Sequence, residues 1–102
     1  MQLKPGTRLR SAAGSTEVVV VRAPADDVDL RCGGHPMLAM SEQPPDGLAV
    51  AVGFDDGSQV GKRYADDAVG IELLCTKAGL GSLSLGADPL ALKGAKPLPS
   101  SD

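Results

Sequence analysis

Few residues of this chain could bind a metal. Cys32 and His35 are separated by two residues, a spacing that lets a thiolate and an imidazole bind one ion. His35 is the only histidine, and the second thiol belongs to Cys75, which follows two leucines and is typical of a core position. A small buried thiol beside an exposed histidine is the other interpretation. The sequence leaves both roles open for Cys32 and His35.

The sequence contains no recognisable set of residues for covalent catalysis. No nucleophile is accompanied by a histidine and an acid at usable positions, and no Gly-rich loop precedes a helix that could hold phosphate. Adjacent acidic residues occur in predicted turns, where Asp bonds to the backbone, with weak cation binding as the alternative. These pairs are Asp26-Asp27, Asp55-Asp56 and Asp66-Asp67. We therefore expect a protein that is not an enzyme.

The composition excludes two classes of partner. The 102 residues carry a formal net charge of −3 and include one Tyr, one Phe and no Trp. Nucleic-acid binding needs clustered cations and often aromatic stacking platforms, so we expect no nucleic-acid partner. No apolar run approaches the ~20 residues of a membrane span, and the first ten residues lack a signal-peptide core. We expect a cytoplasmic protein with reduced thiols and no membrane partner.

An internal repeat organises the elements that must position these groups. The stretch from Thr16 to Met37 returns in shortened form from Ile71 to Leu90. Both copies contain a glutamate, an apolar run, a loop, a second apolar run, and a turn closed by Pro and an apolar residue. The likeness extends backwards, because a Gly-x-Arg motif begins eleven residues before both Glu17 and Glu72.

The repeat predicts one domain with five parts. Asp-Gly between two strand-like runs, at 48–54 and 59–64, predicts the hairpin that joins the copies. Two prolines and a polar end predict an extended tail. The expected units are a single domain at 1–102, comprising ribbon repeat A at 6–40, a connecting hairpin at 41–60, ribbon repeat B at 61–93 and a tail at 94–102.

The expected fold is all-β, because no segment has a convincing helical period. Strands are predicted at 8–11 and 16–22, and the unbroken apolar run Val18–Val21 suggests a strand covered on both faces. The return strands alternate. Leu30 is expected inside with Arg31 outside, and in the second copy Leu83 and Leu85 inside with Ser82 and Ser84 outside.

Short motifs in both copies are shared with one family. The first copy has Leu-x-Cys-Gly and Pro-Met within 28–37, and the second has a Gly-x-x-aromatic motif at 61–64, a Glu with apolar residues at 72–74 and a Gly-rich loop at 79–83. With these motifs the chain resembles the desulforedoxin and desulfoferrodoxin N-terminal domains, which are rubredoxin-like iron or zinc modules. The resemblance implies two tandem β-ribbons forming an intramolecular pseudo-dimer, related by a pseudo-two-fold axis.

The chain departs from that family at the metal ligands. Members use four cysteines in two knuckles, and here most of these positions hold other residues. The positions are Ser11, Gly14 and either Arg31-Cys32 or Cys32-Gly33 in copy one, and Asp66, Val69 and either Ser84-Leu85 or Leu85-Gly86 in copy two. Only Cys32 remains, so the resemblance implies an eroded site. Apolar Val69 and Leu85 suggest a plug of packed side chains in its place.

Two functions follow from these observations. The first is a small noncatalytic accessory or protein-interaction subunit, without cofactor, bound to a larger cytosolic enzyme subunit through an exposed sheet edge and the tail; a homodimer is a further alternative. The second is a zinc or iron protein with a rebuilt site. Its ligands would be Cys32 and His35, completed by Cys75 or Asp66 from the other copy.

Overall fold

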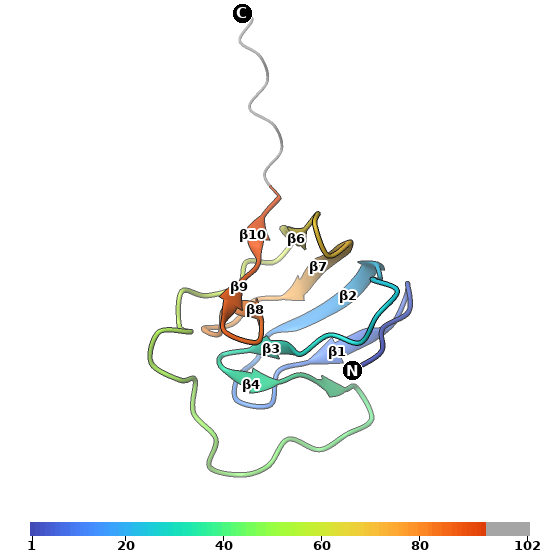
Figure 1. The fold of residues 1–102 in the computed structure, drawn as a ribbon. Coiled ribbons are helices and arrows are strands. Elements are labelled where there is room, and N and C mark those ends of the chain that lie inside the picture. The colour runs from blue at the N-terminus through green and yellow to red at the C-terminus, as the bar shows by residue number, and fades with distance from the viewer. Residues whose placement is uncertain (94–102) are drawn as a thin grey trace, which may run out of the picture.

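The computed structural model describes residues 1–93, so the tail expected at 94–102 lies outside the described residues. The described chain is all-β, as predicted, with ten strands in two antiparallel sheets (Figure 1). The strands are β1 (Arg8–Arg10), β2 (Glu17–Arg22), β3 (Leu30–Cys32), β4 (His35–Pro36), β5 (Leu38–Ala39), β6 (Arg63–Asp66), β7 (Ile71–Lys77), β8 (Leu83–Leu85), β9 (Asp88–Pro89) and β10 (Ala91–Leu92). Within residues 1–93 no helix is long and apolar enough to cross a membrane.

The six-stranded sheet has the order β10-β6-β7-β2-β1-β5. One half, β5-β1-β2, comes from the first copy, and the other half, β10-β6-β7, comes from the second copy in the same order counted from its own edge. The two halves meet where β2 pairs with β7. The register of this central pair is mirrored as well, because Glu17 faces Lys77 at one end and Arg22 faces Glu72 at the other. Opposite charges directly across a strand pair stabilise that register.

The four-stranded sheet has the order β4-β3-β8-β9 and is mirrored about the β3–β8 pair. Gly33 and Gly34 connect β3 to β4 with φ values of 65° and 84°. Two consecutive positive φ angles are the mark of a type I′ hairpin turn, which glycine adopts without steric cost. This turn places Cys32 opposite His35 and, on the other side of β3, opposite Leu83.

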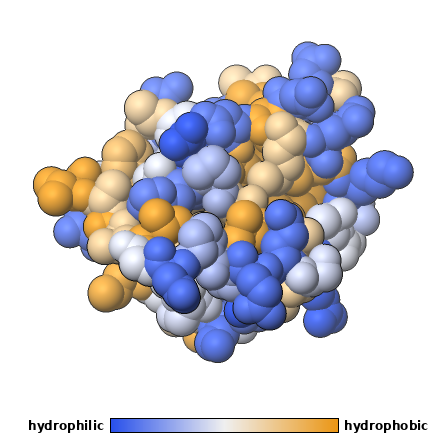
Figure 2. Space-filling model, turned by 90° about the horizontal axis from the view of Figure 1, so that it is seen from below, coloured by the Kyte–Doolittle hydropathy of each residue, from blue (hydrophilic) through white to orange (hydrophobic). Residues whose placement is uncertain are grey.

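One hydrophobic core joins the two sheets. It contains buried residues of β2 and β7 from the larger sheet together with buried residues of β3 and β8 from the smaller one. Its largest fully buried side chains include Leu30 of β3, Leu73 of β7 and Leu83 of β8. On the outside, apolar and hydrophilic side chains are interspersed over the face drawn in Figure 2.

Two expectations about strand faces were wrong. The run in β2 is not covered on both faces, since Val18 and Val20 are buried whereas Val21 is 37% exposed. Ser84 points to the face predicted to be wet, yet it is fully buried. It lies between Arg31 of β3 and Pro89 of β9, and these larger neighbours cover its small side chain.

The connecting hairpin expected within 41–60 does not form, and residues 48–54 are not a strand. Their backbone groups bond to turns of the two copies instead. The Ala51 amide donates to the Gly33 carbonyl at 2.8 Å, and the Ser82 amide donates to the Phe54 carbonyl at 2.8 Å. Ser58 forms a two-way bridge with Gly79. The segment therefore covers the β3–β4 turn and the β7–β8 loop in place of pairing with itself.

Candidate functional site

The strongest candidate site surrounds the Cys32 thiol. Cys32 ends β3 and is completely buried. Burial raises the pKa of this thiol above its ordinary value, because a thiolate would be poorly solvated there. Three buried hydroxyl groups nearby partly oppose that rise; they belong to Thr16, Ser11 and Ser58. The site is a protonated thiol within a small polar pocket.

One of these hydroxyl groups lacks a partner. The Thr16 hydroxyl is buried and makes no hydrogen bond to any described residue. Ser58 by contrast donates its hydroxyl hydrogen to the Gly81 carbonyl. An unsatisfied buried polar atom costs about 1–3 kcal/mol. The Cys32 thiol lies beside this hydroxyl group, close enough for the thiolate form to accept a hydrogen bond from it.

Two glycines of the β7–β8 loop close the pocket. A Cβ atom at Gly81 would lie 2.9 Å from the Cys32 sulfur, and one at Gly79 would overlap the Thr16 hydroxyl oxygen. Any larger residue at either position would collide with the site. A loop of the second copy thus completes the surroundings of a thiol in the first.

The turns after β1 and β6 have the same local construction. The Ser11 hydroxyl oxygen accepts hydrogen bonds from the amides of Ala13 and Gly14, at 3.2 and 3.1 Å. A carboxylate oxygen of Asp66 accepts from the amides two and three residues later, at 3.0 and 3.3 Å. Short polar side chains stabilise turns in this way. The Asp66 carboxylate is therefore used by its own turn.

The remaining predicted ligands lie in different surroundings. Cys75 is buried in β7, and both burial and the nearby Cys32 raise its pKa. Both thiols belong to the same hydrophobic core. His35 lies half-buried, and its Nε2 is 2.8 Å from the Ala49 carbonyl oxygen. Because a carbonyl only accepts, Nε2 carries the proton and Nδ1 is the nitrogen left for a metal.

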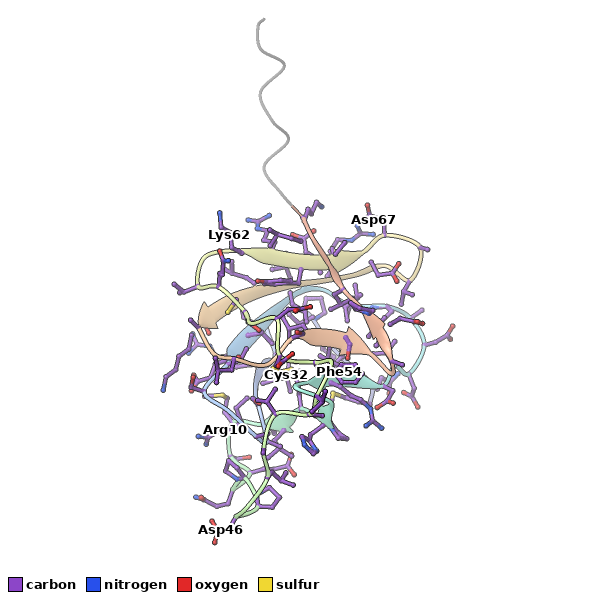
Figure 3. The ribbon with its side chains drawn as sticks, turned by 90° about the vertical axis from the view of Figure 1, so that its left-hand side faces the viewer. Arg10, Cys32, Asp46, Phe54, Lys62 and Asp67 are labelled. Atoms are coloured by element: carbon purple, nitrogen blue, oxygen red, sulfur yellow. The ribbon has the colours of Figure 1, made fainter. Side chains whose placement is uncertain are left out.

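Asp66 is not part of this neighbourhood. It ends β6, at the turn into β7, whereas Cys75 lies four residues along β7, about 13 Å of strand away. Figure 3 shows the neighbouring Asp67 at the edge of the molecule and Cys32 at its centre. Across residues 1–93, no three His, Cys, Asp or Glu side chains are grouped so that they could hold an ion.

A four-thiolate metal site does not fit the residues present. Gly14 offers no donor atom at one of the family's ligand positions. At another, Arg31 is a cation whose Nε lies 2.9 Å from an Asp29 carboxylate oxygen. The predicted apolar plug is also incomplete, because Val69 is 40% exposed. Leu85 does pack against the core.

In copy one the linker closes the site in place of that plug. Val50 lies over the turn, since a Cβ at Gly33 would be 3.2 Å from one of its methyl groups. Little in the sequence indicated that hydroxyl groups would surround Cys32 or that Val50 would cover the turn. The Gly79-x-Gly81 spacing could have indicated a close approach of two chain segments, but serine and threonine at these spacings match no ligand motif.

Comparisons of this chain with models of protein families, with curated proteins and with solved structures each found no match.

Proposed function

We propose that the chain consists of two degenerate desulforedoxin-like ribbons in tandem, packed as an intramolecular pseudo-dimer. The mirrored strand orders of both sheets support this assignment. The matching turn bonds of Ser11 and Asp66 support it independently, because they occur at the positions that correspond in the two copies.

We propose that this protein is a noncatalytic accessory subunit that binds a larger cytosolic enzyme subunit. The observation that carries the proposal is the difference between the two edges of the six-stranded sheet. At β5, the Ala39 amide donates to a Glu42 carboxylate oxygen at 2.9 Å, so this edge is capped. At β10, the Lys93 amide bonds inward to Arg63, which leaves the preceding Leu92 amide directed outward.

The β10 edge is suited to strand addition. Leu92 is 50% exposed, and within residues 1–93 no side chain caps its amide. An extended segment of a partner could pair with this edge through main-chain hydrogen bonds. The chemistry of the interior agrees with a noncatalytic role, because both thiols are buried and have raised pKa values, whereas a reactive thiol needs a lowered one.

Native mass spectrometry of the chain purified gently from its own cells tests this proposal. We expect a stoichiometric complex with a larger subunit, and we expect Leu92→Pro to abolish it, because proline removes the outward donor without breaking the bonds to β6. Ala39→Pro is the matched control at the capped edge and should keep the complex. A bare wild-type chain, or a complex that survives Leu92→Pro, would contradict the proposal.

A second proposal is a rebuilt zinc or iron site at Cys32 and His35, completed by Cys75 or Asp66. The observation that favours it is that both free thiols are buried in the same hydrophobic core. The test is the metal content of protein purified without chelators. One bound metal that disappears in Cys32→Ser but persists in Asp66→Asn would support a site at the buried thiols, whereas loss in Asp66→Asn would place Asp66 among the ligands.

A further inference from the structure

A second site lies on the four-stranded sheet. An open pocket of about 330 Å³ is lined by Asp29, Arg31, Gly34, Phe54, Gly86 and Ala87. Its floor is β3, and the two hairpin turns, Gly33-Gly34 and Gly86-Ala87, form its sides. The remaining wall is the ring of the only phenylalanine. None of these residues belongs to β10 or to the Cys32 pocket.

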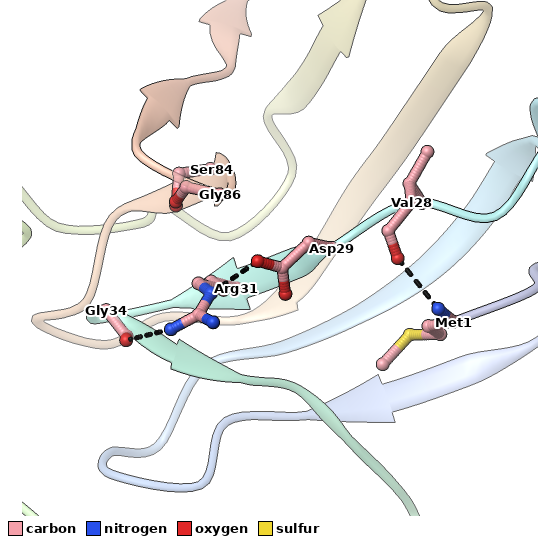
Figure 4. Close-up of polar contacts among 7 residues, drawn as sticks. All are labelled: Met1, Val28, Asp29, Arg31, Gly34, Ser84 and Gly86. Atoms are coloured by element: carbon pink, nitrogen blue, oxygen red, sulfur yellow. Dashed lines mark hydrogen bonds and ion pairs between the residues drawn. The ribbon is translucent and has the colours of Figure 1, made fainter.

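The Arg31 guanidinium is held in place inside this pocket (Figure 4). Its Nε donates to an Asp29 carboxylate oxygen at 2.9 Å, and its Nη1 donates to the Gly34 carbonyl at 3.0 Å. No residue from 1 to 93 accepts a hydrogen bond from Nη2. The side chain remains 35% exposed. The end of a fixed guanidinium fork is therefore free to donate to a ligand.

The opposite wall is apolar. Phe54 packs against Gly34, since a Cβ atom there would be 3.3 Å from the ring. The Phe54 carbonyl accepts from Ser82 and its amide donates to Ala51, so the backbone that carries the ring is fixed on both sides. The pocket thus combines a fixed cation and an aromatic ring in one lining.

We propose that this pocket binds a carboxylate that carries an apolar body. The carboxylate oxygens would accept hydrogen bonds from the free end of Arg31, because a planar guanidinium matches the geometry of a carboxylate. The apolar body would cover the ring of Phe54 and replace water there. A free organic acid and the C-terminal carboxylate of a peptide ending in an apolar residue share this chemistry.

The corresponding positions of the second copy lack these groups. In the register of β3 with β8, Arg31 faces Ser84, and Ser84 donates its hydroxyl hydrogen to the Gly86 carbonyl. The charged pair therefore belongs to one side of the mirrored sheet only. A purely structural ion pair would not require an open pocket in front of its unpaired nitrogen.

NMR titration of the full chain tests the proposal, with benzoate, a short peptide ending in a free Phe carboxylate, and the C-terminal amide of that peptide as probes. We expect both acids, but not the amide, to shift the Arg31 Nε–H and Gly34 amide signals. Tighter binding of benzoate would identify a free acid as the ligand class, and tighter binding of the peptide would identify a chain terminus. No shift with either acid would overturn the proposal.

Two variants with opposite expected effects keep the test decisive. Arg31→Gln should raise the Kd at least about tenfold, because it removes a charge-assisted hydrogen bond. Asp29→Asn should lower the Kd roughly two- to fivefold, because it removes the competing negative charge while Arg31 remains. Arg8→Gln, at an exposed arginine of β1, is the control and should change nothing. Unchanged binding in both pocket variants would contradict the site.

Discussion

The first and second copies supply the two halves of the six-stranded sheet in matching strand order, but the two halves differ in detail. In the first, the inner hairpin holds a buried thiol among hydroxyl groups, and the outer edge strand is capped by Glu42. In the second, Leu85 stands where the thiol is, and the edge strand is open. The mirrored sheets tolerate this divergence because the core strands β2 and β7 carry the shared packing.

The largest difference in stability is expected between alanine substitutions at two glycines, Gly79 and Gly14, neither of which has a positive φ. Gly79→Ala should destabilise the protein by about 3 kcal/mol, because its Cβ would meet the Thr16 amide nitrogen at 2.7 Å as well as the hydroxyl. Gly14→Ala, in the turn of the first copy, meets nothing closer than 3.8 Å and should stay within about 0.5 kcal/mol. Urea unfolding measures both. Equal losses would show that the β7–β8 loop can move away from the Cys32 pocket.

The repeated glutamates provide the next comparison. The Glu72 side chain is only 4% exposed and bonds Lys93 at 2.7 Å and Arg63 at 3.2 Å, whereas Glu17 is partly exposed and lies 3.9 Å from Lys77. Glu72→Gln should therefore cost about 2 kcal/mol and Glu17→Gln less than about 0.5 kcal/mol.

The contribution of Glu72 to stability should also depend on pH. The bond to Lys93 holds the pKa of Glu72 below its ordinary value of 4.5, so its contribution to stability is present above that value and is lost as pH falls through the lower folded-state pKa. Unfolding curves of wild type and Glu72→Gln should converge in acid. A constant difference down to the lowest pH would contradict the assignment.

The buried thiols predict a change at the other end of the pH scale. Burial raises the pKa of Cys32 and of Cys75 above the ordinary value of 9.0. The contribution of these thiols to the free energy of unfolding is present below the unfolded-state pKa and is lost as pH rises through the folded-state pKa. For each thiol the loss is up to about 1.4 kcal/mol per pH unit. Chemical denaturation between neutral and alkaline pH should show a shallower decline in Cys32→Ala. An unchanged slope would mean that the thiolate is already accommodated in the fold.

The smallest expected effect distinguishes two hydroxyl groups of the Cys32 pocket. Thr16→Val replaces an unpartnered hydroxyl group by a methyl group and should leave stability unchanged or raise it by up to about 1 kcal/mol. Ser11→Ala removes the acceptor of two amide hydrogen bonds and should cost about 1 kcal/mol. Thermal melts of both variants suffice. A marked loss in Thr16→Val would show that the hydroxyl group has a partner in solution, such as a bound water.

The sequence predicted the strands where local pattern and packing agree. Alternation around Leu30 and Arg31 identified β3 and its faces, because period-two patterning reflects burial directly. The strand prediction failed for residues 48–54, because the backbone of this apolar run bonds to turns that are distant in sequence. For the candidate site, Cys32 was found because its spacing from His35 is that of two metal ligands. Its hydroxyl neighbours come from two separate segments, the β1–β2 turn and the linker, and only the folded chain brings them together.

The pairing of β2 with β7 also sets a condition on biosynthesis. The partners in this pair are about 50 to 60 positions apart, so the centre of the larger sheet cannot form from local contacts. At translation rates of 5–20 residues per second, the valine-rich β2 waits roughly 3 to 10 seconds for its partner to be made. During that interval its edge can accept a strand from another nascent chain. We therefore expect pairing between neighbouring nascent chains to compete with formation of the larger sheet.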